Sequence, residues 1–142
     1  MEIRSAAIAD YDRLVALDGL GPGNPQRRDQ IRAWIETGCC YLVETSGSVR
    51  ACGVLDYHFF GNGFIELVMV GENFRRQGLG IALVRHFKEI CATPKLFTST
   101  NASNLQMQKL LNSAGFRTSG FVDNLDENDP EIVFYVRAQV RD

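Results

Sequence analysis

The alternation of apolar and polar positions at the start of the chain predicts a strand followed by two helices. Residues 3–7 are expected to form the strand, and residues 10–18 a helix that its first residue caps. A loop over residues 19–25 separates this helix from a second one, for which Asn24 is the expected cap. Gly38 is expected to end the second helix.

The middle of the chain predicts three consecutive strands joined by tight turns, because short apolar runs alternate with glycine-containing segments. The third strand is apolar on both faces, which is typical of a strand covered on both sides. Glu66 is the one polar residue inside it. The strands are expected at residues 40–44, 49–60 and 64–70, with turns at residues 46–47 and 61–63.

The C-terminal half predicts helices and strands in alternation. A helix is expected to open at Ser103, with Gln106 completing a capping box, and to end at Gly115. The element order β-α-α-β-β-β-α-β-α-β-β mixes hairpin and crossover connections, so it predicts a mixed sheet with helices on its faces. The other elements expected here are a helix with apolar residues from Leu79 to Ile90 and strands at residues 96–100, 116–122 and 131–138.

Length and composition exclude several classes of protein and agree with the predicted fold. The 142 residues suit one domain, and 45% hydrophobic and 23% charged residues exclude disordered, collagen-like and low-complexity chains. A net charge of −2 gives no basic field, so neither nucleic acid nor an anionic membrane is expected as a partner. No apolar run of membrane-spanning length and no secretory signal are visible, so we expect a cytoplasmic protein.

The cysteines and histidines give no sign of a metal centre. None of the cysteines belongs to a C-x-x-C pair, which argues against a zinc site or a dithiol redox motif. Cys52 and Cys91 lie among apolar residues, so we expect reduced, buried thiols. His58 and His86 are isolated in the sequence and are interpreted as structural, so no metal is expected.

The strongest functional signal is a glycine-containing segment between the apolar third strand and the helix that follows it. The segment is Arg75-Arg76-Gln77-Gly78-Leu79-Gly80. Glycines at a helix start allow a ligand to approach the backbone closely, and the free amides and positive dipole end there suit a phosphate. It is neither a Walker loop nor a dinucleotide fingerprint, because Gly-Lys-Ser/Thr and a third glycine at the required place are absent.

In this context the segment resembles the Q/R-x-x-G-x-G/A signature with which N-acetyltransferases of the GNAT superfamily bind acetyl-CoA. Arg75, Gly78 and Gly80 occupy its fixed positions. A second landmark of that family is an asparagine opening the helix after the next strand and a Gly-Phe closing it. Asn104 and Gly115-Phe116 match this landmark in the usual order and spacing.

The resemblance covers essentially the whole chain and implies a fold and a cofactor. The fold would be α+β in α/β/α layers, with a mixed, largely antiparallel sheet of six to seven strands and four helices, as one N-acetyltransferase domain over residues 1–142. Acetyl-CoA would be the co-substrate, and its pantetheine arm would pair with strand-edge groups where the fourth and fifth strands splay apart. The implied cofactor contacts are the backbones of Val68, Met69 and Val70 for the pantetheine, Arg75 and the amides from Arg76 to Ile81 for the pyrophosphate, and Asn104 beside the pantetheine.

Acetyl transfer to an amine requires a base, because an amine is protonated near neutral pH and must lose a proton before it attacks. Glu66 is the candidate base, since desolvation in an apolar strand raises a carboxyl pKa toward neutrality. Period-two counting places it on the same face as Val68 and Val70. The alternative is that Glu66 pairs with an arginine or faces solvent. The backbone N–H of Val70 is the expected donor to the carbonyl oxygen as charge develops.

The chain departs from the family pattern where many members carry a tyrosine that protonates the leaving thiolate. Leu111 stands there and cannot donate a proton, and the family's other common acidic position falls near Ser99. Water could protonate the thiolate, or Tyr57, Tyr135 or Ser103 could substitute. The sequence does not select among them.

Two charged segments point to opposite charges on the acceptor, so they do not select among the small-molecule and peptide amines that stay open. Residues 123–131 hold five carboxylates and no basic residue, which suits either an acidic rim for a cationic amine or a solvated hairpin tip. Arg27, Arg28 and Arg32 form a basic helix face that suits either an anionic acceptor group or solvent. The strand at residues 131–138 is apolar enough for a homodimer contact.

Two other functions stay open at the level of sequence. A non-catalytic acyl-CoA-binding module of the same fold is favoured by Leu111 and predicts cofactor binding without an acetylated product. A phosphate-binding domain of unrelated function predicts that ATP or NAD outcompetes CoA, and the Asn104 and Gly115-Phe116 landmarks argue against it.

Overall fold

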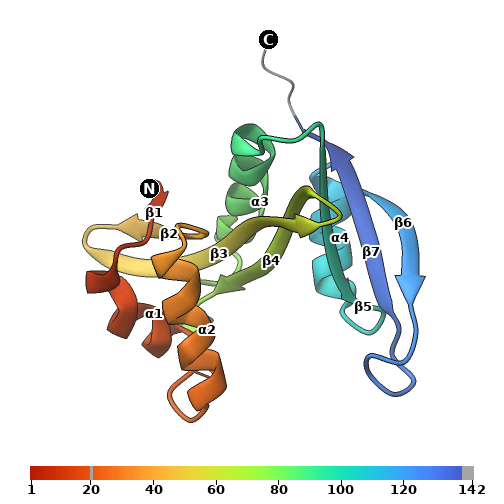
Figure 1. Ribbon diagram of the computed structural model, residues 1–142. Helices are drawn as coiled ribbons and strands as arrows, with labels where there is room; N and C mark the ends of the chain where they lie inside the picture. Colours follow the sequence, from red (N-terminus) through yellow and green to blue (C-terminus); the bar gives the residue numbers. More distant parts are fainter. Residues whose placement is uncertain (20, 139–142) are drawn as a thin grey trace. The chain divides into compact units, whose positions relative to one another are not determined.

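The computed structural model describes residues 1–19 and 21–138, which form one mixed sheet of seven strands (Figure 1). The strands are β1 (Glu2–Ser5), β2 (Cys40–Thr45), β3 (Ser48–Phe59), β4 (Asn62–Val70), β5 (Lys95–Asn101), β6 (Arg117–Val122) and β7 (Glu131–Arg137). Their order is β1-β2-β3-β4-β5-β7-β6, in which β4 and β5 pair in parallel. The pairs β1–β2, β2–β3, β5–β7 and β6–β7 are antiparallel, which confirms the predicted α+β class.

The helices follow the expected order. Over the described part of the chain they are α1 (Tyr11–Leu17), α2 (Pro25–Glu36), α3 (Leu79–Ile90) and α4 (Leu105–Ser113), with short 3₁₀ turns η1 (Ile8–Asp10) and η2 (Glu72–Phe74). Leu20 of the predicted loop and the last four residues of the predicted domain lie outside the described residues. No helix in the described ranges is both long and apolar enough to cross a bilayer.

The cap of α4 and the turn between β3 and β4 differ from the prediction. Asn24 caps α2 as predicted, but the cap of α4 is Asn104, whose Oδ1 accepts from the Met107 amide at 3.0 Å, instead of Ser103. The turn between β3 and β4 lies at Phe60 and Gly61, both with positive φ (53° and 76°), instead of at residues 61–63. Two consecutive left-handed residues suit the twist of a two-residue hairpin, so Asn62 already belongs to β4.

The chain divides into two compact units, which are described separately below. The first comprises residues 1–55 and 67–83, and the second comprises residues 56–66 and 84–142. The division falls inside β3, β4 and α3. One N-acetyltransferase domain over residues 1–142 stays a prediction.

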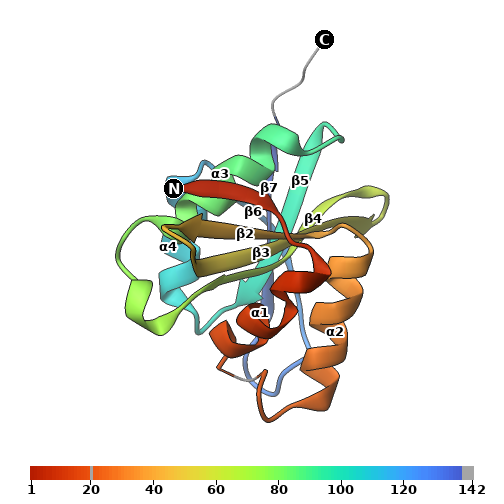
Figure 2. The same ribbon diagram turned by 90° about the vertical axis from the view of Figure 1, so that its left-hand side faces the viewer.

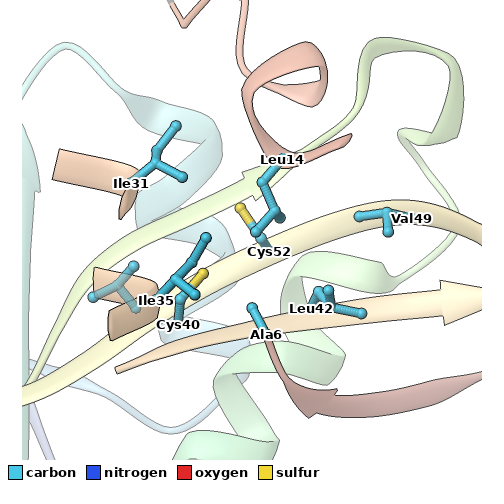
Figure 3. Close-up of a cluster of buried hydrophobic side chains, with 9 residues drawn as sticks. Ala6, Leu14, Ile31, Ile35, Cys40, Leu42, Val49 and Cys52 are labelled. Atoms are coloured by element: carbon cyan, nitrogen blue, oxygen red, sulfur yellow. The ribbon is translucent and has the colours of Figure 1, made fainter. Parts of the chain in front are cut away.

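The first unit has its core between its strands and the helices α1 and α2, which lie side by side in Figure 2. Leu14 from α1 and Ile31 and Ile35 from α2 are buried together with Leu42 and Cys52 (Figure 3). These positions share one face of each element, as the sequence periodicity predicts. Of the residues predicted as reduced, buried thiols, Cys52 lies in this core and Cys91 is buried in the second unit, and both are free. The partly buried Trp34 packs against the same cluster.

An ion-pair network ties β1, α1 and β2 together in the first unit. Asp10 is 3% exposed and accepts hydrogen bonds from Arg4 at 2.9 and 3.0 Å, from the Ala7 amide at 2.8 Å and from Arg13. The same two arginines contact Glu44 at 3.4 and 3.2 Å. The hydrogen bonds from Arg4, aided by those from Ala7 and Arg13, hold the pKa of Asp10 well below its usual range. Asp10 stands at the predicted N-cap position of α1, but its side chain serves this network and makes no capping hydrogen bond to the helix.

The second unit is built on β5, with β7 beside it and β6 at the outer edge of β7 (Figure 1). Side chains alternate along these strands, so Leu96 and Thr98 on β5 and Phe134 on β7 are buried. Phe97 and Tyr135 point to the opposite face and are half-buried. β7 is thus paired on both edges, so neither edge is open to a second copy of the chain. The predicted homodimer would have to form through the edge strand β6 or through a face of the sheet.

The acidic loop after β6 is fastened to the connection between β5 and α4. Asp129 accepts hydrogen bonds from the Ser103 amide at 3.0 Å and from its hydroxyl at 2.6 Å. Asp126 accepts from the Asn101 side chain at 2.8 Å. Two of the loop's carboxylates therefore hold the hairpin tip in place, which favours the structural interpretation of this loop for those two groups.

Candidate active site

The segment after β4 is shaped by close packing at its start and by left-handed backbone at its end. The Gly71 amide donates to the Arg50 carbonyl at 2.9 Å, and a Cβ on Gly71 would lie 2.5 Å from Leu17. A side chain at this position would require the end of the Leu17 side chain to move aside. Arg76 and Gly78 both have positive φ, 65° and 77°. A non-glycine residue held in this conformation is uncommon, and such residues cluster at ligand sites.

The start of α3 offers open space and backbone amides to an anion. Residues 75–78 are exposed, and a Cβ on Gly78 would meet no atom within 4 Å. The Ala82 amide donates to the Gly78 carbonyl at 3.1 Å, so the amides of residues 79–81 belong to the first turn, where helical N–H groups have no partner in the helix. This arrangement fits the pyrophosphate of the predicted cofactor.

The end of β4 contains the three residues predicted to pair with pantetheine. Val68, Met69 and Val70 are half-buried. Met69 packs against the core of the first unit, so Val68 and Val70 point the other way. The ladder between β4 and β5 comprises the pairs Gly63–Leu96, Phe64–Phe97 and Ile65–Thr98. Over the described residues this ladder therefore ends before the predicted pantetheine segment begins.

An open groove of about 870 Å³ lies in the first unit beside this segment. Its lining includes Met69, Val70 and Arg75, all from the predicted cofactor contacts. Leu17 and Ser48 also line it. Three of the residues predicted to contact the cofactor, two from the end of β4 and one from the segment after it, thus line one groove.

Glu66 on β4 forms a hydrogen bond with Asp56, which comes from the end of β3 in the same unit. Asp56 is 6% exposed and accepts from the His58 amide at 3.2 Å. Glu66 is exposed, but partial burial of its carboxyl, followed by the charge and hydrogen bond of Asp56, raises its pKa to about 7, against the opposing charge of His58. The pair can therefore exchange a proton near neutral pH, which is what a base for amine chemistry requires.

Sequence reasoning missed Asp56, and it counted Glu131 only among the carboxylates of the acidic loop without placing it beside Ser99. Asp56 ends an apolar run, the same signal that singled out Glu66, so it could have been found. Glu131 on β7 accepts a hydrogen bond from the Ser99 hydroxyl at 2.7 Å. It thus stands beside the β5 position where the resemblance places an acid. Only the pairing of β5 with β7 brings Glu131 there, so no local pattern could have indicated it.

The possible proton donors all have protein partners. Leu111, at the position where a tyrosine is usual in the family, is fully buried. The Tyr57 hydroxyl accepts from the Ala92 amide at 3.0 Å, the Tyr135 hydroxyl accepts from Arg117 at 2.8 Å, and the Ser103 hydroxyl donates to Asp129. The oxygen of the Asn104 side chain is used as the α4 cap, which leaves its NH₂ group for the predicted cofactor contact.

The arginines that form the basic face of α2 each contact a partner within the first unit. The basic face is therefore explained without an anionic acceptor. Arg27 pairs with Asp18 at 2.8 Å, Arg28 donates to the Pro22 carbonyl at 2.7 Å, and Arg32 lies 4.7 Å from the centre of the Tyr11 ring. Across the described residues, no group of three or more His, Cys, Asp or Glu side chains is placed to hold a metal ion.

Comparison with known proteins gives a family and a close structural relative. Residues 8–116 match the Acetyltransferase (GNAT) family. An acetyltransferase of the GNAT family from Bacillus cereus is 38% identical to this chain, with 98% of each chain covered and a TM-score of 0.91. A comparison with curated protein sequences finds no significant match.

Two more distant structures share the fold. The ribosomal-protein-S18-alanine N-acetyltransferase from Escherichia coli is 17% identical, covers 99% of this chain and 96% of its own, and has a TM-score of 0.78. The protein yncA from Salmonella typhimurium, solved with its cofactor acetyl-CoA, is 15% identical over 100% of this chain and 96% of its own, with a TM-score of 0.78. At these identities the likeness concerns the fold alone.

Proposed function

Because the chain belongs to the GNAT family of acetyltransferases and is an acyltransferase, we propose that it transfers an acetyl group from acetyl-CoA to an amine by direct attack in a ternary complex. The observation that carries this proposal is the Asp56–Glu66 pair. It supplies a carboxyl group whose pKa is about 7 on the strand that leads into the glycine-containing segment.

The cofactor would be held by the residues around the start of α3. The exposed segment from Arg75 to Gly78 and the first-turn amides up to Ile81 fit a pyrophosphate, and the backbone of Val68–Val70 would pair with the pantetheine arm. Asn104 would contribute its side-chain NH₂ group. When bound, acetyl-CoA supplies the acyl group and a thiolate leaving group.

The chain's own groups would manage the protons and the developing charge. Glu66, ionised above its pKa of about 7, accepts one proton from the ammonium group of the acceptor and so frees the nitrogen lone pair. The N–H of Val70 is the proposed donor to the carbonyl oxygen. Because Leu111 is buried and has no proton to give, the departing thiolate takes its proton from water.

The proposal is tested first by calorimetric titration of acetyl-CoA into the purified protein, with ATP and NAD as controls. Saturable one-to-one binding of acetyl-CoA alone is expected. An amine panel read by mass spectrometry should then show a product that carries one added acetyl group. Preferential binding of ATP or NAD would contradict the cofactor assignment and support a phosphate-binding domain of another function.

A second candidate is a non-catalytic acyl-CoA-binding module, which the buried Leu111 favours. It predicts the same calorimetric result but no acetylated amine at any pH between 6 and 9. The raised pKa of Glu66 favours the enzyme, because a binding module has no use for a base poised near neutrality. A homodimer and a cytoplasmic location stay predictions.

A further inference from the structure

Four aromatic side chains lie next to one another on a face of the second unit and are called the aromatic row: Phe59, Phe64, Phe97 and Tyr135. The ring of Phe59 lies 5.0 Å from those of Phe64 and Phe97, and Phe97 lies 5.9 Å from Tyr135. The strand registers explain this, since Phe64 is opposite Phe97 on β4–β5 and Phe97 is opposite Tyr135 on β5–β7. The row therefore crosses neighbouring strands at one level of the sheet.

The aromatic row is not part of the buried core. Its four side chains are half-buried, whereas Leu96, Thr98 and Phe134, next to them in sequence, are buried on the other face. Phe60, at the hairpin turn, is 90% exposed and packs edge-on against Phe59 with ring centres 5.1 Å apart. A contiguous apolar face that remains accessible on a small domain marks a binding surface.

Charged groups border the row on the same face. Glu66 follows Phe64 by two residues and so lies on the same side of β4, about 6.6 Å further along the strand. Ser99 likewise follows Phe97 by two residues, and its hydroxyl donates a hydrogen bond to the Glu131 carboxylate at 2.7 Å. At the far end, the Arg117 guanidinium lies 5.6 Å from the centre of the Tyr135 ring and donates to its hydroxyl at 2.8 Å.

We propose that the aromatic row binds the body of the acceptor, and that the acceptor is a small primary amine carried on an aromatic or similarly flat apolar group. This inference rests on the proposed function, because it takes Glu66 as the group that receives the amine proton. An ammonium placed at the Asp56–Glu66 pair would have its substituent beside Phe64 and Phe97. Aromatic faces attract both flat rings and cations, and the carboxyl groups complement the positive charge.

The test compares two amines of similar length and basicity, 2-phenylethylamine and hexylamine, as acceptors in the presence of saturating acetyl-CoA. We expect kcat/KM to be at least tenfold higher for 2-phenylethylamine. Phe97→Leu and Phe64→Leu, which keep an apolar side chain, should bring the ratio of the two kcat/KM values close to one without changing the KM for acetyl-CoA. Phe121→Leu, at a phenylalanine of β6 that is 67% exposed, is the matched control and should leave the ratio as it is.

A binding measurement makes the test independent of turnover. Saturation-transfer NMR of 2-phenylethylamine should show contact with the unsubstituted protein and with Glu66→Gln, and a strongly reduced signal with Phe97→Leu. Thermal melting of each variant checks that it is folded.

The outcomes separate the two proposals. Acetylation of both amines with equal kcat/KM, or a ratio that Phe97→Leu leaves unchanged, would overturn the role of the aromatic row while leaving the acetyltransferase intact. Binding of acetyl-CoA without acetylation of any amine would overturn the proposed function, and with it this acceptor.

Discussion

The carboxyl groups of Asp56 and Glu66 share a hydrogen bond across β3 and β4, one buried and the other exposed. Two carboxyl groups this close resist being ionised together, so the proton affinity of the exposed one rises. The relationship turns a single acid, which the sequence singled out, into a pair with a defined pH response. Its consequences can be measured in both catalysis and stability.

Glu66→Gln should lower kcat/KM for amine acetylation on the order of 100-fold, because general base catalysis typically contributes that much or more. In the unsubstituted enzyme, kcat/KM should fall as the pH drops below about 7, where Glu66 becomes protonated. The variant should lose this limb of the pH profile. Glu127→Gln, the same change in the exposed acidic loop, is the control, and an equal effect of both substitutions would remove Glu66 from the role.

Asp56→Asn should shift the acidic limb of the pH profile to lower pH. The charge and hydrogen bond of Asp56 raise the pKa of Glu66, but partial burial is the larger cause, so the midpoint should fall below about 7 and stay above the ordinary value of 4.5. Asp56 acts through Glu66 and is a positioning residue. A pH–rate midpoint that does not move would contradict the pairing.

Glu66 should also make folding pH-dependent. Its folded-state pKa is raised from 4.5 to about 7, so the stability it contributes is present below pH 4.5 and is lost as the pH rises through 7. Glu66→Gln should therefore be more stable than the unsubstituted protein at pH 8, by about 1 kcal/mol after allowing for solvent around the exposed side chain, and equal to it near pH 4.5. Urea unfolding at the two pH values measures this, and the opposite sign would rule out the raised pKa.

Asp10→Asn should destabilise the first unit by roughly 3 kcal/mol, because it leaves Arg4 and Arg13 without their buried partner. The pKa of Asp10 is lowered in the folded state, so its contribution is present above the ordinary value of 3.8 and is lost as the pH falls below it. The cost of the substitution should shrink at pH 2.5. Asp12→Asn, in the first turn of the same helix, is the control and should change the urea midpoint little.

Gly78→Ala should weaken acetyl-CoA binding about tenfold or more, or ~1.4 kcal/mol. The new Cβ enters the open space beside the loop, where the proposed pyrophosphate lies. Gly38→Ala is a closely matched control, since Gly38 has nearly the same φ (75° against 77°) and equally open surroundings at the end of α2. Both variants should lose a similar amount of stability, and calorimetry should find weaker acetyl-CoA binding only in Gly78→Ala.

Much of the fold follows from local patterns. Asn24 at the start of α2 and the apolar spacing of α3 each carry their own signal, so their elements are found where they were expected. The differences in capping have a physical reason. Ser103 and Asp10 are good cap residues in isolation, but the Ser103 hydroxyl donates to Asp129 and the Asp10 carboxyl accepts from Arg4. Both partners come from outside the helix.

In the candidate site, too, some features follow from local sequence and others depend on how distant strands pair. The glycine-containing segment and Glu66 can be found from sequence, since one is contiguous and the other is a lone acid among apolar residues. The contact between Ser99 and Glu131 and the stacking of Phe97 on Tyr135 depend on the order β5-β7-β6, in which a strand late in the chain is inserted beside β5. No periodicity in the sequence predicts that β7 lies between β5 and β6.

The buried Leu111 limits which side chains its position can hold. A tyrosine there would force a larger ring and a hydroxyl into a fully packed interior. Overpacking of this kind costs about 1–3 kcal/mol, a large share of the roughly 5–15 kcal/mol that keeps a domain folded. Neighbouring side chains would have to become smaller before this position could accept a tyrosine. An engineered proton donor at residue 111 therefore requires a redesigned core around it and not a single substitution.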